Sequence, residues 1–348
     1  MYMPLSIDFE SRGLIPPPPR RASWCTLKKC CCITATLFTV LVVGLILTFI
    51  FVAYIPIENP IPVPDFAYGP FNTSETEVYV GGFYNKDGSQ DAWAFYPSAD
   101  ALRVFPVLSF SHGDGGGGFM LHWAFSGLLR LVASHGFVVV AHKSCFWPWD
   151  CGPGMTGSEQ YTDQLRVLEW ALGEAHGLPV DREKAGGVFG QSTGGRTSIQ
   201  CAAAASKGTL SGSTSVGAAV ALHPDPCIGE HDGWLHGDCD SAKDVDGPIA
   251  VFTSSDDTTE PEGSAKANFD AAVSGDKLFG SMKGVTHVKG TGPVWGLYVA
   301  AWMKVFLEGD DDYYSDIVYG SGERSVCGLG KEFLEVDEWE AACVIVKM

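Results

Sequence analysis

The pattern of hydrophobic positions begins with one long uninterrupted run. Residues 33–55, ITATLFTVLVVGLILTFIFVAYI, contain no charged side chain and lack the polar stripe of a helix that packs on a protein core. As a helix the run would extend roughly 35 Å, enough to cross a bilayer. It follows 32 residues and is longer than the apolar part of a cleaved signal peptide, so we predict a transmembrane signal anchor.

Beyond a proline-rich segment at 56–66, short apolar runs typical of strands alternate with patterns typical of helices. The strand patterns lie at 77–84, 91–97, 104–111, 136–142, 185–190, 216–222, 248–254 and 278–286. The helical patterns lie at 159–175, from about 191 to 205 and at 292–307. Several of these strands are apolar throughout, which a sheet covered on both faces requires. We therefore predict a stiff stalk over 56–66 and one α/β domain over 67–348 with a doubly wound, mostly parallel sheet.

The charge distribution predicts an orientation for the anchor. Residues 1–32 carry five basic and two acidic side chains, a net charge of +3, so the rest of the chain carries −21 of the total of −18. The positive-inside rule keeps the basic tail cytoplasmic and sends the C-terminal domain to the lumenal or extracellular side. The strong negative charge argues against nucleic acid as a partner of that domain. Asn72 begins an N-glycosylation sequon on the outward side.

Eleven cysteines form two groups. Four lie in the tail beside the apolar run, where palmitoylation and a plain run of membrane-edge thiols explain them equally well: Cys25, Cys30, Cys31 and Cys32. The other seven would face an oxidising compartment. Their local spacing suggests the disulfide pairs 145–151, 227–239 and 327–343 and leaves Cys201 as a buried thiol, although sequence cannot prove the connectivity.

The stretch Gly187–Thr197, GVFGQSTGGRT, contains the pattern G-x-S-x-G centred on Ser192. The pattern alone is weak, but here an apolar strand precedes it and a helical pattern follows it. That context is the one in which a strand-to-helix turn exposes a nucleophilic serine. Small residues around the serine are needed because side chains there would collide with neighbouring elements. We predict Ser192 as a nucleophile.

A nucleophilic hydroxyl needs a base, and the base needs an acid that fixes its tautomer. The acidic pair Asp256 and Asp257 follows the strand pattern at 248–254, and His287 follows the pattern at 278–286. Both lie at the strand ends where doubly wound sheets carry their chemistry. His287 is the predicted base, and spacing alone does not separate Asp256 from Asp257 as the acid.

The glycine-rich stretch 111–118, SHGDGGGG, predicts an oxyanion hole, because such turns expose backbone N–H groups to a developing negative charge. The expected donors are the amides of Thr193 and of Asp114 or Gly115. The same stretch matches the dinucleotide-binding pattern G-x-G-x-x-G. That alternative requires an acidic residue at the end of the next strand, where His142 and Lys143 stand, so no nucleotide cofactor is expected.

With these residues in place, the chain from about 69 to 343 resembles the serine esterases of the α/β-hydrolase fold. The nearest resemblance is to the branch of polyester hydrolases, cutinase-like enzymes and dienelactone-hydrolase-related proteins, which includes chlorophyllase-like ones. It is carried by the segments ASHGFVVV, FGQSTGG, PIAVFTSSDDTTEP, GVTH and AWMKVFLEGDDDYYS. The resemblance implies Ser192 as nucleophile, Asp257 as acid, His287 as base, and Asp114 and Thr193 as oxyanion donors.

Three positions depart from that family. Asp114 replaces an aromatic residue, Thr193 replaces a methionine after the nucleophile, and His223 replaces a tryptophan at the end of strand 216–222. These changes put a polyester or long-chain substrate in doubt and leave the chemistry intact.

Residues expected around the substrate are His112, Trp147, Trp149 and His223. The two tryptophans lie in CFWPWDC, which could equally wall a cleft or pack its own loop. His223 also opens a histidine- and aspartate-rich stretch that continues through His231, Asp232, His236 and Asp238. Its spacing fits no standard zinc pattern, so no metal is expected.

The sequence therefore predicts a membrane-anchored serine hydrolase that cleaves carboxylic esters, without cofactor, through an acyl-enzyme. Its expected substrate is a small-molecule or polymeric ester. Alternatives within the enzymes are a chlorophyllase- or lipase-like esterase and a thioesterase. An alternative of another class is a catalytically inactive binding or adhesion module that kept the hydrolase fold.

Overall fold

The computed structural model describes residues 38–44, 67–81, 91–98, 103–114, 116–118, 120–143, 160–173, 177–210, 214–225, 239–282, 285–287, 295–322, 324–327 and 342–347. The chain divides into a unit of residues 1–55 and a unit of residues 56–348. In the first unit residues 38–44 are helical. Among the residues that the structure describes, no helix has the length and apolar character that a membrane crossing requires. The basic tail, most of the predicted anchor and the stalk lie outside them.

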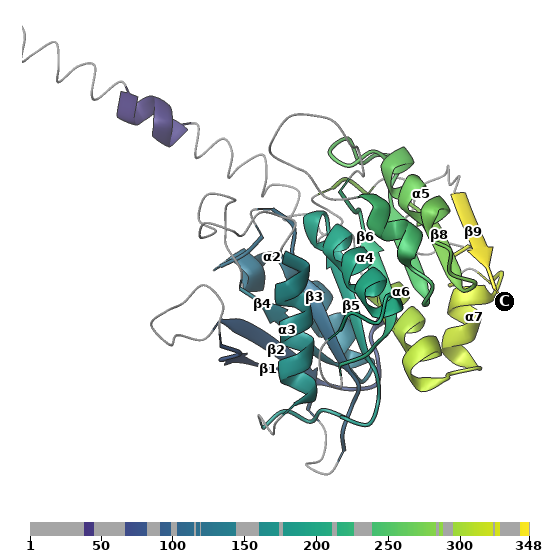
Figure 1. Ribbon diagram of the computed structural model, residues 1–348. Helices are drawn as coiled ribbons and strands as arrows, with labels where there is room; N and C mark the ends of the chain where they lie inside the picture. Colours follow the sequence, from purple (N-terminus) through teal and green to yellow (C-terminus); the bar gives the residue numbers. More distant parts are fainter. Residues whose placement is uncertain are drawn as a thin grey trace, which may run out of the picture. The chain divides into compact units, whose positions relative to one another are not determined.

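The second unit is built on one nine-stranded sheet with the strand order β1-β2-β4-β3-β5-β6-β7-β8-β9 (Figure 1). The six inner strands from β4 to β8 run parallel, whereas β1, β2 and β9 pair antiparallel at the two edges. The strands are β1 (Thr73–Val78), β2 (Ala92–Pro97), β3 (Val107–Ser111), β4 (Val138–His142), β5 (Gly186–Gln191), β6 (Val216–Leu222), β7 (Ile249–Thr253), β8 (Lys277–Ser281) and β9 (Ala342–Val346).

The predicted α/β class with a mostly parallel sheet is confirmed. Two details differ at the edges. The first strand begins at Thr73, four residues before the predicted start, and pairs with β2 along its whole length. Strand β9 was not predicted, because its alternation is short and follows an acidic tail. It pairs with β8 in the register Gly280↔Cys343 and closes the second edge of the sheet.

Helices cover both faces of the sheet and enclose two hydrophobic cores. Side chains of α2, α6 and α7 share one core with the sheet, and those of α3, α4 and α5 share the other. Figure 1 shows α3 and α4 side by side on their face. The helices are α2 (Met120–Ser134), α3 (Gln160–Leu172), α4 (Thr193–Ser206), α5 (Glu262–Ala271), α6 (Gly296–Met303), which continues as a π-helical turn (Lys304–Glu308), and α7 (Tyr313–Tyr319).

The sheet order reverses between β3 and β5. Strand β3 pairs with β4 on one side and with β5 on the other, so the loops after β3 and β5 leave the sheet in different directions. Doubly wound sheets open a crevice at the carboxyl ends of the strands at such a point. The loop after β3 begins with His112 and Gly113, and the turn after β5 is Ser192. The topology therefore brings the two predicted catalytic loops to the same place.

Helix α4 approaches the end of β3 so closely that no side chain fits between them. A Cβ atom on Gly194, in the first turn of α4, would overlap the carbonyl oxygen of Ser111. A Cβ atom on Gly190 would overlap the backbone of Gly194 and the same oxygen. Both obstacles are backbone atoms, which cannot rotate away. The turn that carries Ser192 is therefore packed backbone against backbone.

We predict that Gly194→Ala lowers the free energy of unfolding by about 3 kcal/mol, because α4 must move away from Ser111 to admit the methyl group. The matched control is Gly263→Ala, in the first turn of α5, where a Cβ atom meets nothing within 4 Å. That change should raise stability by about 0.5 kcal/mol through helix propensity. Urea unfolding of both variants checks this, and equal stabilities would contradict the packing argument.

Candidate active site

Ser192 occupies a strained position between β5 and α4. It is the N-cap of α4 with φ of 60° and ψ of −126°, and it is one of two non-glycine residues with positive φ among those that the structure describes. A serine gains nothing locally from this conformation, so the surrounding structure must impose it. Its amide donates to the Leu222 carbonyl at the end of β6, and its carbonyl accepts from the Arg196 amide in α4. The strain places the hydroxyl at the strand ends.

Asp257 and His287 meet at the ends of the neighbouring strands β7 and β8. Nδ1 of His287 lies 2.8 Å from Oδ2 of Asp257. Oδ1 of Asp257 accepts the amides of Thr259 and Glu260 at 2.9 and 2.8 Å. Burial would raise the pKa of Asp257, but the hydrogen bonds from His223 and His287 outweigh burial and hold it well below its usual range. The carboxylate is therefore ionised and orients the His287 ring.

The structure separates the two candidate acids. Asp257 is buried and bonded to His287. Asp256 is exposed, and its backbone amide donates a hydrogen bond to the Ser254 hydroxyl. Only Asp257 can fix the tautomer of His287 in this geometry.

A second histidine, His223, also contacts Asp257. Its Nδ1 lies 2.7 Å from Oδ2 of Asp257, and its Nε2 accepts the indole N–H of Trp295 at 3.0 Å. Both nitrogens of the fully buried His223 ring are thus occupied. Nε2 of His287 instead lies 3.2 Å from Nε2 of Gln191, the residue next to Ser192. Of the two histidines, His287 is the one whose outer nitrogen contacts the residue next to Ser192.

The ligand-type atoms of His223, Asp257 and His287 lie within 4.8 Å of one another, which raises the question of a metal ion. Both Nδ1 atoms are only 2.7–2.8 Å from Oδ2 of Asp257. Ligands of a tetrahedral zinc ion would stand about 3.3 Å apart, given bond lengths near 2.0 Å. The spacing is that of direct hydrogen bonds, so these residues do not fit a metal as they stand.

A buried group of charges lies on another side of Ser192. Its hydroxyl donates to Oδ1 of Asp225 at 3.2 Å, and the Thr193 hydroxyl donates to Oδ2 at 2.9 Å. Nη1 of Arg196, in α4, lies 3.4 Å from Oδ2 of Asp225, and both side chains are buried. Burial, the charge of Asp225 and a hydrogen bond to it raise the pKa of Glu260 to about 9. A protonated Glu260 and Arg196 together balance the Asp225 carboxylate at neutral pH.

The reacting atoms of the nucleophile and the base therefore each have another partner. Ser192 Oγ bonds Asp225, while Gln191 Nε2 contacts the Nε2 atom of His287 that would receive a proton. An amide N–H that donates to this nitrogen requires the tautomer with the proton on Nδ1, which is the tautomer that a general base needs. Catalytic hydrogen bonds often form fully only with substrate present.

Of the three predicted oxyanion donors, the structure describes Thr193 and Asp114. Thr193 is the first residue of α4, so its amide is one of the helix N-terminal N–H groups without an acceptor in the helix itself. Asp114 lies in an exposed turn after β3, and Gly115 lies outside the described residues. A Cβ atom on the preceding Gly113 would stand 2.7 Å from Cβ of Ser192. The loop after β3 thus passes directly beside the nucleophile.

The expected substrate contacts fall into two groups. Trp147 and Trp149 lie outside the described residues, as do His231, Asp232, His236 and Asp238. His112 and His223 are both buried. Nδ1 of His112 bonds the Gly113 carbonyl at 2.7 Å, and burial lowers its pKa to about 4. His223, expected at the substrate cleft, has no exposed surface, and its ring bonds Asp257 and Trp295 instead.

Sequence analysis missed four residues of this site: Gln191, Arg196, Asp225 and Glu260. Gln191 is a variable position of the five-residue pattern, which assigns no role to it, and Arg196 lies two residues beyond the pattern. Asp225 follows β6 and Glu260 follows β7, at the strand ends that doubly wound sheets use. Their position at the strand ends is the one signal in the sequence that points to them.

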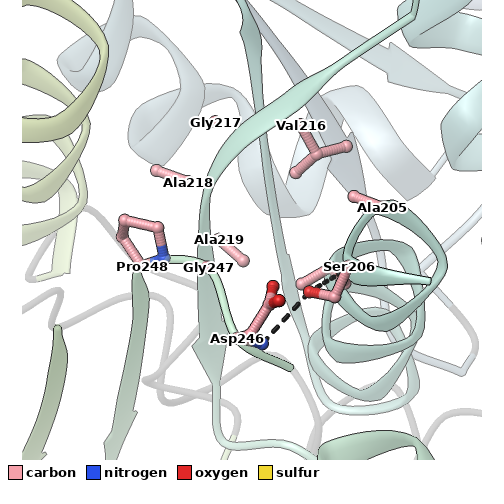
Figure 2. A pocket seen from close by; sticks show the side chains of 10 residues that line it. Ala205, Ser206, Val216, Gly217, Ala218, Ala219, Asp246, Gly247 and Pro248 are labelled. Atoms are coloured by element: carbon pink, nitrogen blue, oxygen red, sulfur yellow. Dashed lines mark hydrogen bonds between the residues drawn. The ribbon is translucent and has the colours of Figure 1, made fainter. Parts of the chain in front are cut away.

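A separate cavity of about 140 Å³ lies at the opposite end of the strands (Figure 2). It is lined by small residues at the start of β6, the end of α4 and the turn before β7, and the Asp246 amide donates to the Ser206 hydroxyl at 3.1 Å beside it. Its lining residues include one carboxylate, that of Asp246, and no histidine. The predicted catalytic residues Ser192, Asp257 and His287 lie instead at the carboxyl ends of the strands.

The comparisons with known proteins leave the family open. No protein-family model matches the chain, and no curated protein matches it in sequence.

We predict that stability falls as pH rises from about 5 to about 9, owing to Glu260. Its pKa of about 9 in the fold exceeds the ordinary value of 4.5, so the folded chain binds a proton that the unfolded chain has lost over this interval. The contribution is complete below pH 4.5 and disappears above pH 9.

Urea unfolding at pH 6 and pH 9.5 measures the effect. In Glu260→Gln, which stays neutral, the loss of stability between these values should be smaller than in the wild type. Glu262→Gln, in the first turn of α5, serves as the control and should behave like the wild type. An unchanged slope in Glu260→Gln would contradict the raised pKa.

Proposed function

We propose that this protein is a serine hydrolase of carboxylic esters. The observation that carries the proposal is the strained Ser192 at the strand-to-helix turn, together with a hydrogen-bonded Asp257–His287 pair whose Nε2 contacts Gln191, the residue before Ser192. Strain of this kind in a non-glycine residue concentrates at functional sites. The order serine, aspartate, histidine along the chain, each at the end of its strand, supports membership of the α/β-hydrolase fold.

In the proposed reaction, the Ser192 hydroxyl turns from Asp225 to Nε2 of His287 as Gln191 gives way. His287 accepts the proton while Oγ attacks the ester carbonyl, and the ionised Asp257 stabilises the imidazolium. The Thr193 amide, at the positive end of α4, and an amide of the loop after β3 stabilise the oxyanion. His287 then protonates the leaving alkoxide, and water attacks the acyl-enzyme by the reverse proton path.

The residues around Ser192 favour uncharged acyl groups. Asp225 stands 3.2 Å from the nucleophilic oxygen, so an acyl group with its own carboxylate would meet a second negative charge there. A chlorophyllase- or lipase-like esterase and a thioesterase use the same chemistry and are distinguished by substrate screening. An inactive binding module is the alternative of another class, and it has no use for a strained serine beside an oriented histidine.

We also propose that residues 33–55 anchor the chain in a membrane, with the C-terminal unit on the lumenal or extracellular side.

We predict that a fluorophosphonate probe labels the full-length chain, kept in mild detergent, and that Ser192→Ala abolishes labelling. The activated hydroxyl is the only group removed by that change. Ser206→Ala, on the same helix and beside the cavity of Figure 2, should be labelled like the wild type. Hydrolysis of p-nitrophenyl esters should follow the same pattern. A folded wild type without labelling would favour the binding module, and labelling of Ser192→Ala would contradict this assignment of the nucleophile.

We predict that Asp257→Asn lowers the rate of p-nitrophenyl ester hydrolysis on the order of 10³- to 10⁴-fold, because the amide no longer holds His287 in the required tautomer. Its neighbour provides a matched control, since Asp256 is exposed whereas Asp257 is buried and bonds the His287 ring. Asp256→Asn should leave the rate unchanged. A large loss in Asp256→Asn with little loss in Asp257→Asn would reverse the assignment of the acid.

A further inference from the structure

We infer that His223 is a positioning residue for the proposed reaction, acting on His287 through the carboxylate that the two rings share. The inference rests on the proposed function. It concerns a residue that does not touch the nucleophile, and it assigns a task to a buried histidine whose ring has no surface toward solvent.

The first argument is the geometry at Asp257. Oδ2 is 2.7 Å from Nδ1 of His223 and 2.8 Å from Nδ1 of His287, while Oδ1 accepts two backbone amides. The carboxylate is held from every direction in which it accepts hydrogen bonds. Rotation that would turn Oδ2 away from His287 must also break the bond to His223. His223 therefore restricts the direction in which Asp257 presents its charge.

The second argument is the tautomer of His223. The indole N–H of Trp295 donates to Nε2 of His223 at 3.0 Å, so that nitrogen carries no proton. The proton of the neutral ring is then on Nδ1, where it points at Asp257. Burial lowers the pKa of His223, which keeps the ring neutral. Trp295 stacks on Phe252 of β7 and is itself fully buried, so the donor that fixes the tautomer is rigid.

The third argument is backbone strain. His223, with φ of 44°, is the other non-glycine residue with positive φ among those that the structure describes, besides Ser192. Its amide donates to the Phe252 carbonyl at 2.7 Å, which continues the pairing of β6 with β7 by one residue. A histidine in this conformation costs free energy that an extended residue would save. This strained residue is the one whose ring bonds Asp257 from the end of β6.

The chemical consequence follows from the sharing of Oδ2. A second N–H donor takes part of the negative charge of that oxygen and lowers its basicity. Without His223, Asp257 would attract the proton on His287 more strongly and would be free to rotate. The protonated form of His287 would be stabilised relative to the neutral form, which is the form that activates Ser192.

The test compares His223→Leu with His223→Asn in the full-length chain. An asparagine side chain can place its amide N–H where Nδ1 stands, and asparagine tolerates positive φ better than most residues. Leucine fills similar space without a donor. The second-order rate constant of fluorophosphonate labelling is measured from pH 5 to 9, since its pH dependence reports the base in the free protein.

We expect His223→Leu to label about tenfold more slowly at neutral pH, as for loss of one hydrogen bond to a charged group, with the acidic midpoint of the profile at higher pH. His223→Asn should restore the wild-type midpoint. A folded His223→Leu with the wild-type midpoint would overturn the inference. If His223→Leu does not fold, Trp295→Phe replaces it: the midpoint should move in the same direction, and an unmoved midpoint would overturn the inference.

Failure of the proposed function gives a different result. In that case the wild type is not labelled at any pH, or labelling survives Ser192→Ala. The inference about His223 is tested only by the midpoint in variants whose labelling depends on Ser192, so the two failures are distinguishable.

Discussion

The left-handed backbone at Ser192 is the constraint on which the rest of the site depends. A serine in this conformation is unstable on its own, and it persists because three neighbours hold the turn: the Leu222 carbonyl on β6, the first turn of α4, and the end of β3. The last contact is backbone against backbone, so the turn cannot relax by moving a side chain. The same contacts bring the loop after β3 within reach of Ser192. Placement of the hydroxyl and placement of the neighbouring amides are consequences of a single packing arrangement.

The charged part of the site depends on the register of parallel strands. His223 follows β6, Asp257 follows β7 and His287 follows β8, and these strands are adjacent in that order. Because parallel strands end at the same edge of a sheet, three residues separated by 34 and 30 positions meet at one carboxylate oxygen. Asp257 lies between the two histidines in the sequence, and its strand β7 lies between theirs in the sheet. Its position after the central strand of the three explains how it bonds both rings.

The fold class followed from sequence because its signal is local: apolar strands alternating with helical patterns are visible without tertiary information. The strand at 216–222 was predicted to the residue for this reason. Helix α2 was overlooked, since it directly follows a run of glycines, and β9 is defined by pairing with β8 rather than by its own composition.

Within the site, the nucleophile, the base and the pair of candidate acids could be found from motif and order. The choice of Asp257 over Asp256 followed only from resemblance. The side-chain partners could not be found, because hydrogen bonds such as Thr193 to Asp225 and Trp295 to His223 depend on how loops return to the sheet edge. The paths of these loops cannot be predicted from the order of residues along the chain.

The loop 257–260 carries two acidic side chains, one of which contacts the proposed base and the other the surroundings of the proposed nucleophile. Its first residue, Asp257, orients His287, and its last, Glu260, bonds Asp225, which holds the Ser192 hydroxyl. The loop is closed on itself, because Oδ1 of Asp257 accepts the Glu260 amide. A displacement of this short segment would therefore disturb the base and the nucleophile together. The contacts of this one segment thus link the environment of the proposed base to that of the proposed nucleophile.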